Sequence, residues 1–267
     1  MKRLIVLFIV GISSQGTMVC IGMPSLSRNE IRSIGQRVWK NECAGKVIGL
    51  TSWNEREEFA SLGIGHFIWY PRGLQKSYAE TFPELISFFK KKGIIMPSCV
   101  LSDDLGACPW ASREEFLNDL NSPCLIQLRE LLSSTVDIQA EFIVNKSYGV
   151  LERLLASTSS SLEKKHLKKQ FYRVAASPGG TFALIDYINF KGEGANGHEQ
   201  YDDHAWGLKQ VLLTISGDKS GRVALEEFVA AAKKVLSKRV AHAPTQRHEE
   251  RWIPGWYARL DGYLSWI

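Results

Sequence analysis

Apolar residues recur at helical spacing through most of the chain. The first such segment opens with a capping box formed by Ser27 and Glu30, after which Ile31, Ile34, Val38 and Trp39 share one helix face. The same periodicity predicts helices over residues 80–92, 125–132, 138–155, 162–176 and 223–240, one starting at Ser112 and one capped by Thr181. The pattern therefore predicts a mainly α (α+β) fold.

A short stretch near residues 55–71 breaks this periodicity. Two glycines flank Ile64, which suits a tightly curved strand or hairpin where another group approaches the backbone. In an extended segment, Glu55, Glu57 and Ser61 share one face, whereas Glu58 takes the other. A carboxylate and a hydroxyl could therefore face the same cleft.

Glu42 falls on the apolar face when the count of the first helix is continued. A carboxyl group that loses hydration favours its protonated form, as a proton donor near neutral pH must. Glu42 is therefore our candidate general acid. The alternative is a structural role, in which Glu42 extends to water at the helix end or pairs with an arginine.

Three blocks resemble the phage-type lysozymes, the muramidases that cleave peptidoglycan. The first joins Glu42, through a glycine and an acidic stretch, to Ser61-Leu62-Gly63-Ile64-Gly65-His66, where the family usually has Thr in place of Ser61. The second covers residues 182–194 and is similar to the family's buried helix with its closing Gly-Glu turn. The third is Arg251-Trp252, followed eight residues later by Arg259. The resemblance implies a two-lobed lysozyme-like fold with a small β-hairpin in the N-terminal lobe.

The resemblance also implies roles for individual residues. Glu42 would protonate the leaving oxygen, a hairpin carboxylate would support the transition state or activate water, Ser61 would hold that water, and Arg259 would orient Glu42. We take Glu57 as the second carboxylate, while Glu55 and Glu58 stay open. Expected substrate contacts are His66, Tyr70, Glu193, Tyr201 and Arg259.

The expected reaction is hydrolysis of the β-1,4 bond between N-acetylmuramic acid and N-acetylglucosamine in peptidoglycan glycan strands. Two alternatives stay open. A single acid/base glutamate would suffice for a lytic transglycosylase, which forms 1,6-anhydro products, and residues 207–211 are faintly similar to a Gly-Leu-Met-Gln run of those enzymes. A non-catalytic cell-wall-binding protein could keep the same fold.

Residues 1–22 are typical of a secretory signal, with Lys2 and Arg3 before an apolar run over residues 4–12. This run is too short for a stable membrane span. We therefore expect export to the periplasm or the medium, leaving residues 23–267 as one catalytic domain. Cys20 raises the possibility of lipid attachment.

The formal charge of +5 falls to +3 when Lys2 and Arg3 are removed. So mild and dispersed a charge argues against nucleic-acid binding and suits an anionic polymer weakly. The six histidines show no ligand spacing, and residues 216–228 have too few carboxylates for a calcium loop, so we expect neither metal nor cofactor. We expect a monomer.

Four cysteines remain outside position 20, namely Cys43, Cys99, Cys108 and Cys124. An even number in an exported protein permits two disulfides. Cys99 and Cys108 bracket a short polar loop, so we favour that pair; the alternative is free buried thiols.

Overall fold

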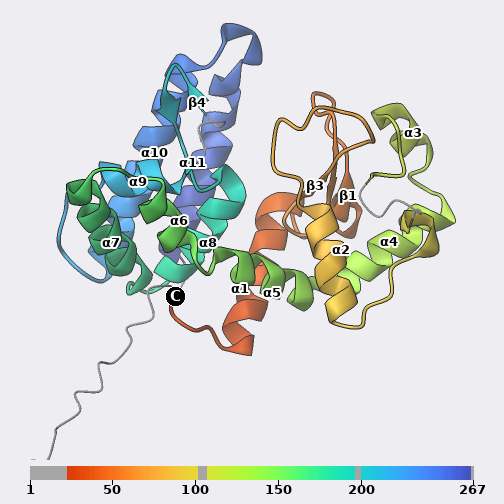
Figure 1. Ribbon diagram of the computed structural model, residues 1–267, viewed down its shortest axis with the longest axis horizontal. Coiled ribbons are helices and arrows are strands. Elements are labelled where there is room, and N and C mark those ends of the chain that lie inside the picture. Colours follow the sequence, from red (N-terminus) through yellow and green to blue (C-terminus); the bar gives the residue numbers. More distant parts are fainter. Residues whose placement is uncertain (1–22, 102–106, 196–199, 266–267) are drawn as a thin grey trace, which may run out of the picture.

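The computed structural model describes residues 23–101, 107–195 and 200–265 (Figure 1). The expected secretory segment, with Cys20, lies outside these residues. Helices dominate the described chain and accompany a small antiparallel sheet near the N-terminus, which confirms the predicted mainly α (α+β) class. Figure 1 shows two lobes, one around the sheet and one formed by the C-terminal helices.

The N-terminal lobe is built around a three-stranded antiparallel sheet in the order β1, β2, β3. Ser61 lies opposite Ser52 on one side and Ile68 on the other, so the expected hairpin carries a third strand. The elements of this lobe are β1 (Thr51–Ser52), β2 (Ala60–Leu62), β3 (Phe67–Trp69), α2 (Phe82–Lys91), α3 (Arg113–Asn118) and α4 (Pro123–Ser134), with 3-10 turns Val47–Leu50 and Ser98–Val100.

The C-terminal lobe is a helical assembly with a two-stranded ribbon that the sequence pattern did not predict. Its longest helix, α10, is predicted over residues 223–240 and extends slightly further at both ends. The elements are α6 (Val150–Ala156), α7 (Ser161–Ala175), α8 (Gly180–Lys191), β4 (Gln200–Tyr201), β5 (His204–Ala205), α9 (Leu208–Thr214), α10 (Arg222–His242) and α11 (Ile253–Asp261), with 3-10 turns Thr245–Arg247, Glu249–Trp252 and Gly262–Ser265.

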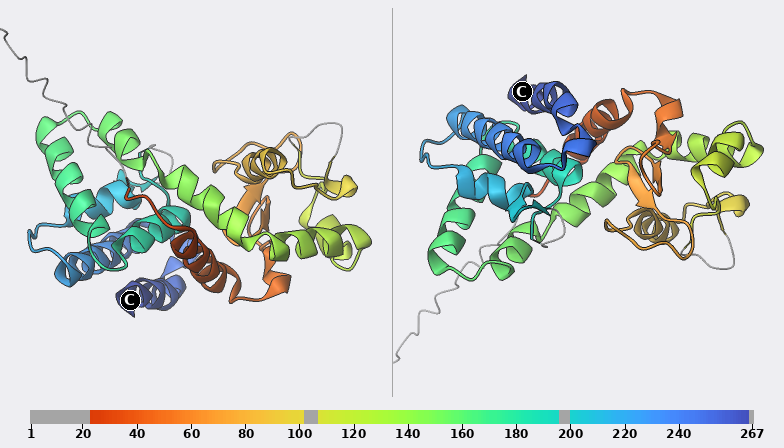
Figure 2. Two further views of the ribbon diagram at one scale, coloured as in Figure 1. Left: turned by 90° about the horizontal axis from the view of Figure 1, so that it is seen from below. Right: turned by 90° about the horizontal axis from the view of Figure 1, so that it is seen from above.

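Helices α1 (Arg28–Cys43) and α5 (Val136–Ser147) run between the lobes and pack against each other (Figure 2). Their close approach depends on Gly35, where an added Cβ would come within 2.6 Å of the Cβ of Ala140. An exposed ion pair between Arg32 and Asp137 joins the same two helices. The packed pair of α1 and α5 therefore joins the two lobes.

The predicted capping box starts α1 as expected, because Ser27 Oγ accepts from the Glu30 amide while the Glu30 carboxylate accepts from the Ser27 amide. The helix ends where Ala44 adopts a left-handed conformation with φ of 51°. This boundary places Glu42 in the last turn of α1.

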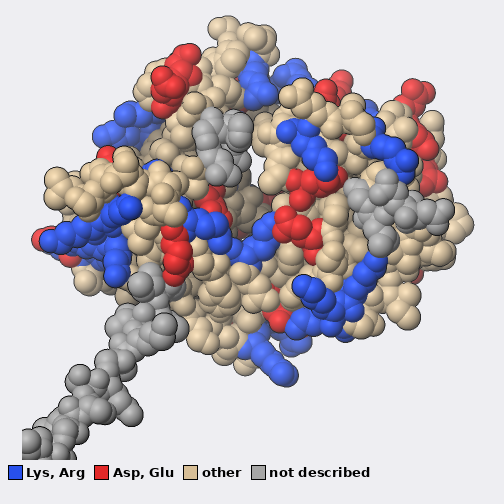
Figure 3. Space-filling view, in the orientation of Figure 1, with Lys and Arg blue, Asp and Glu red and all other residues tan. Residues whose placement is uncertain are grey.

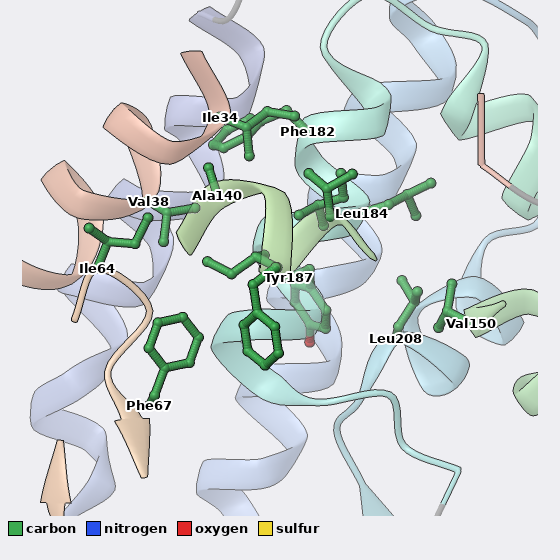
Figure 4. Close-up of a cluster of buried hydrophobic side chains, with 14 of the residues drawn as sticks. Ile34, Val38, Ile64, Phe67, Ala140, Val150, Phe182, Leu184, Tyr187 and Leu208 are labelled. Carbon is green, nitrogen blue, oxygen red and sulfur yellow. The ribbon is translucent and has the colours of Figure 1, made fainter. Parts of the chain in front are cut away.

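The buried core is continuous between the two lobes. Figure 4 shows side chains from α1, α5 and α8, including Val38, Ala140 and Phe182, in one cluster that also receives Ile64 from the turn after β2. Each of these four side chains is at most 2% exposed. Burial of apolar surface contributes about 25 cal/mol per Å², so this cluster stabilises the packing of α1, α5 and α8.

The expected pairing of Cys99 with Cys108 is wrong. Cys108 is a free, buried thiol, and so is Cys43. The Cys108 amide donates to the carbonyl of Tyr70, and the Cys108 side chain belongs to the buried core. Cys124 is disulfide-bonded. Within the described chain, no helix combines the length and apolar character needed to cross a bilayer.

Candidate active site

The carboxylate of Glu42 lies at the junction of the two lobes and touches three polar side chains. Its Oε1 accepts from Arg259 Nη2 at 2.7 Å and from Asn189 Nδ2 at 3.2 Å. Its Oε2 lies 3.6 Å from Nδ1 of His66. The Glu42 side chain is 15% exposed, so it is largely shielded yet open to a ligand. These surroundings are more polar than the apolar face predicted for Glu42.

Arg259 on α11 is fixed from behind by a fully buried carboxylate. Asp186 on α8 accepts from Arg259 Nε and Nη2 at 2.8 and 2.9 Å, and from the Tyr263 hydroxyl at 2.6 Å. Burial disfavours the guanidinium, but the charges of Asp186 and Glu42 outweigh this effect and hold the pKa of Arg259 well above its ordinary value. Arg259 is therefore a permanent cation aligned on Glu42, as the resemblance implies.

Glu57 and Ser61 meet on the N-terminal side of the site. Ser61 on β2 is 3% exposed, and its hydroxyl lies 3.5 Å from Glu57 Oε2, which also accepts from Asn54 Nδ2 at 2.9 Å. Burial raises the pKa of Glu57, and this effect exceeds the opposing contributions of Asn54, His66 and Ser61. Glu55 and Glu58 are exposed. Of the three hairpin acids, Glu57 is the one that contacts Ser61.

The imidazole of His66 contacts Glu42 and the Cys43 thiol. Its Nδ1 faces Glu42, its Nε2 lies 3.5 Å from the Cys43 thiol, and its charge acts on Glu57. The Cys43 thiol is not a candidate nucleophile, because burial, followed by the nearby Glu42 charge, raises its pKa to about 12. His66 thus touches Glu42 directly, and its effect on Glu57 is to lower the pKa of that carboxyl group against the larger effect of burial.

Tyr70 does not fit its expected role as a substrate contact. The side chain is 1% exposed, and its ring packs edge-on against Phe59 with centroids 5.1 Å apart. Its hydroxyl accepts from the Tyr78 amide at 3.1 Å. Tyr70 therefore has no free face for a sugar and instead supports the loop that carries Tyr78.

Glu193 also has a structural partner in place of the expected sugar. Its carboxylate accepts hydrogen bonds from the side chain of Arg153 of α6, from Nε at 2.9 Å and from Nη2 at 2.6 Å. This bidentate pair ties the end of α8 to α6. Tyr201 keeps an accessible position on β4, where its hydroxyl donates to Glu249 at 2.8 Å and its ring lines a pocket with Tyr78.

Two residues of the site, Asp186 and Asn189, were not singled out from the sequence. Both lie on α8, the helix predicted to be apolar on nearly all sides. A charged residue in the middle of such a helix must be paired, so the sequence could have identified Asp186 as a buried carboxylate with a polar partner. Asn189 follows three residues later, which places it on the same face of α8, toward Glu42.

The described residues contain no cluster of three or more His, Cys, Asp or Glu side chains that could hold a metal ion. In the calcium-loop-like segment 216–228, Glu227 instead binds Arg173, with Oε2 2.5 Å from Nη2. Figure 3 shows acidic and basic side chains gathered around the hollow between the lobes. No protein-family model, curated protein or solved structure matches this chain.

Proposed function

We propose that the protein is a muramidase that hydrolyses the β-1,4 bond between N-acetylmuramic acid and N-acetylglucosamine in peptidoglycan. The observation that carries the proposal is a pair of carboxyl groups at the site: Glu42 on the end of α1, 3.6 Å from His66, and Glu57, hydrogen-bonded to Ser61 on β2. A pair of carboxyl groups flanking the scissile bond is the general requirement for glycoside hydrolysis.

Glu42 acts as the general acid. Arg259 and Asn189 both donate to Oε1, which leaves Oε2 as the oxygen that carries the transferable proton. This proton passes to the glycosidic oxygen as the bond to the leaving sugar breaks. The charge of Arg259 then stabilises the carboxylate that remains, because the guanidinium is already in place and needs no reorganisation.

Glu57 and Ser61 act on the opposite side of the bond. In its ionised form, Glu57 takes a proton from the attacking water, while the Ser61 hydroxyl holds that water by a hydrogen bond. Glu57 also stabilises the positive charge that develops on the sugar ring in the oxocarbenium-like transition state. Asn54 fixes the carboxylate that performs both tasks.

Two other functions remain as outcomes of the test. A lytic transglycosylase would need Glu42 alone, with the muramyl 6-hydroxyl attacking in place of water. A cell-wall-binding protein would need neither acid. The contact between Glu57 and Ser61 favours hydrolysis, because a transglycosylase has no use for a group that holds water. Residues 1–22 support export to the compartment where peptidoglycan lies.

The test is digestion of purified peptidoglycan by the protein without residues 1–22, with the products analysed by mass spectrometry. We expect reducing-end muropeptides from the parent and a loss of about 10²–10⁴-fold in rate for Glu42→Gln and for Glu57→Gln. Glu55→Gln is the matched control, because Glu55 is an exposed acid of the same loop.

Anhydro products, with activity retained in Glu57→Gln, would identify a transglycosylase. If the parent releases no products, and both the parent and Glu42→Gln co-sediment with peptidoglycan, the protein is a binding protein. Full activity of Glu42→Gln would refute the assignment of the acid.

A further inference from the structure

A pocket of about 300 Å³ is lined by residues from both lobes. One side comes from the loop between β3 and α2, with Ser77 and Tyr78, and the other from the C-terminal lobe, with Gln200, Tyr201, Trp206 and Arg247. No acidic side chain is among the described residues that line it. The pocket thus combines aromatic rings, hydrogen-bonding groups and one cation.

The charge of Arg247 is poorly compensated. Glu249 is 5% exposed and is already occupied by Arg239, which donates to both of its oxygens at 2.7 and 2.9 Å. Arg247 lies 3.7 Å from the same carboxylate, and its side chain is 49% exposed. Two guanidinium groups therefore share one carboxylate, and the exposed one borders the pocket.

Alternating basic side chains and rings connect this pocket to Glu42. Arg259 lies over the ring of Phe190 at 4.2 Å, and Lys191 lies over the ring of Trp256 at 3.7 Å. Arg239 continues the series 4.0 Å above Trp206, which contacts Tyr201. We name this series the cation–ring row; its members are Arg259, Phe190, Lys191, Trp256, Arg239, Trp206, Tyr201 and Arg247.

We propose that the pocket binds a carboxylate of the peptide attached to the muramyl sugar, with Arg247 as the residue that pairs with it. This inference rests on the proposed function. The cation–ring row leads from the acid that cleaves the glycan to a cation with spare charge, and the rings of Tyr201 and Trp206 offer an apolar surface to the peptide. In the free protein Arg247 donates to the hydroxyls of Tyr201 and Tyr78, and a carboxylate replaces these neutral acceptors with a charged one.

The first experiment measures binding to the Glu42→Gln protein, which keeps the ligand intact. The probes are muramyl dipeptide, which carries a carboxylate, and N-acetylglucosamine trimer, which is neutral. We expect Arg247→Gln to weaken muramyl dipeptide binding about 10-fold or more and to leave trimer binding unchanged. Arg251→Gln is the matched control, because Arg251 is an exposed arginine of the same region, stacked on Trp252.

The second experiment separates the pocket from the reaction. The protein with Glu42 intact should cleave peptide-bearing strands faster than strands stripped of peptide by an amidase, and Arg247→Gln should abolish the preference. Equal effects of Arg247→Gln and Arg251→Gln on muramyl dipeptide binding, or equal weakening of both probes by Arg247→Gln, would overturn the proposal. Cleavage of both substrates at equal rates would overturn the pocket and leave the muramidase assignment standing. If the protein cleaves neither substrate but binds muramyl dipeptide only when Arg247 is present, the muramidase assignment is overturned and the pocket proposal stands.

Discussion

Substitution of Asp186 by Asn tests whether the buried ion pair behind Glu42 holds the site together. Asp186 is fully buried and accepts from Arg259, from the Tyr263 hydroxyl and from Asn41 Nδ2 at 3.2 Å. Asn has nearly the same volume, so the substitution opens no cavity. The substitution removes the negative charge of Asp186. It also replaces one acceptor oxygen with an NH2 group, which is a donor and cannot accept from Arg259, Tyr263 or Asn41.

The expected loss follows from the geometry. In Asp186→Asn, the guanidinium of Arg259 loses its buried carboxylate and keeps its contact with Glu42. Removal of one partner from a buried, hydrogen-bonded pair typically costs about 3–5 kcal/mol. For a chain of this length, that loss lowers Tm by about 6–20 °C. Tyr263→Phe removes a single hydrogen bond to the same carboxylate and should cost about 1.5–3 kcal/mol.

The assay is urea unfolding together with the rate of peptidoglycan cleavage well below Tm. Asp137→Asn is the matched control, because Asp137 pairs with Arg32 at the surface, where solvent screens the pair, and the substitution should change stability little. Asp186→Asn should also slow cleavage, since Arg259 loses the bonds that align it on Glu42. A stability loss no larger than that of Asp137→Asn would refute the reasoning.

Three further predictions concern titrating groups. Burial raises the pKa of Glu57, so its ionisation destabilises the folded protein as the pH rises through that pKa; Glu57→Gln should match the parent in Tm near about pH 3 and exceed it near about pH 7. Burial, followed by the charges of Arg239 and Arg259, holds the pKa of Lys191 well below its ordinary value. Lys191→Met should therefore raise Tm at neutral pH. This gain should disappear as the pH approaches the pKa of a free lysine, about 10.4. Burial raises the pKa of Cys43 and of Cys108 to about 12, so iodoacetamide at about pH 8 should modify them only after denaturation, as measured by mass spectrometry.

Each of these predictions has an internal comparison. Glu55→Gln and Lys40→Met remove exposed charges, so their Tm differences from the parent should vary little with pH. If the Tm difference from the parent varied with pH in the same way for Glu57→Gln and for Glu55→Gln, the burial of Glu57 would be contradicted. Rapid labelling of Cys43 in the native protein would show that the contact between His66 and the thiol is open to reagent.

Local elements were predictable from the sequence because their signals are local. The capping box of Ser27 and Glu30 and the periodicity of α10 each depend on residues within a few turns of one another. Neither the third strand β1 nor the ribbon of β4 and β5 was predicted, since strands of two residues carry no measurable alternation.

The site was predictable only in part, because its contacts join residues far apart in sequence. Glu42 and Arg259 were placed together by resemblance, whereas the pairing of Asp186 with Arg259 follows from tertiary packing that no local pattern encodes. The cysteine pairing failed for the same reason. Cys99 and Cys108 are close in sequence, but Cys108 is a free, buried thiol next to the segment of Tyr70, to whose carbonyl its amide donates.

The glycines on either side of Ile64 allow side chains of α5 and α8 to pack against the turn that carries His66. An added Cβ at Gly63, whose φ is 72°, would lie 2.4 Å from Gln139 Oε1, and one at Gly65 would lie 3.0 Å from Asn189 Oδ1. The spaces left by the two glycines are therefore filled by a buried amide of α5, which accepts from the Ile64 amide at 2.9 Å, and by the α8 amide that donates to Glu42. Because α5 and α8 fix the turn from both sides, the positions of Ser61 and His66 relative to Glu42 depend on helix packing more than on the short strands themselves.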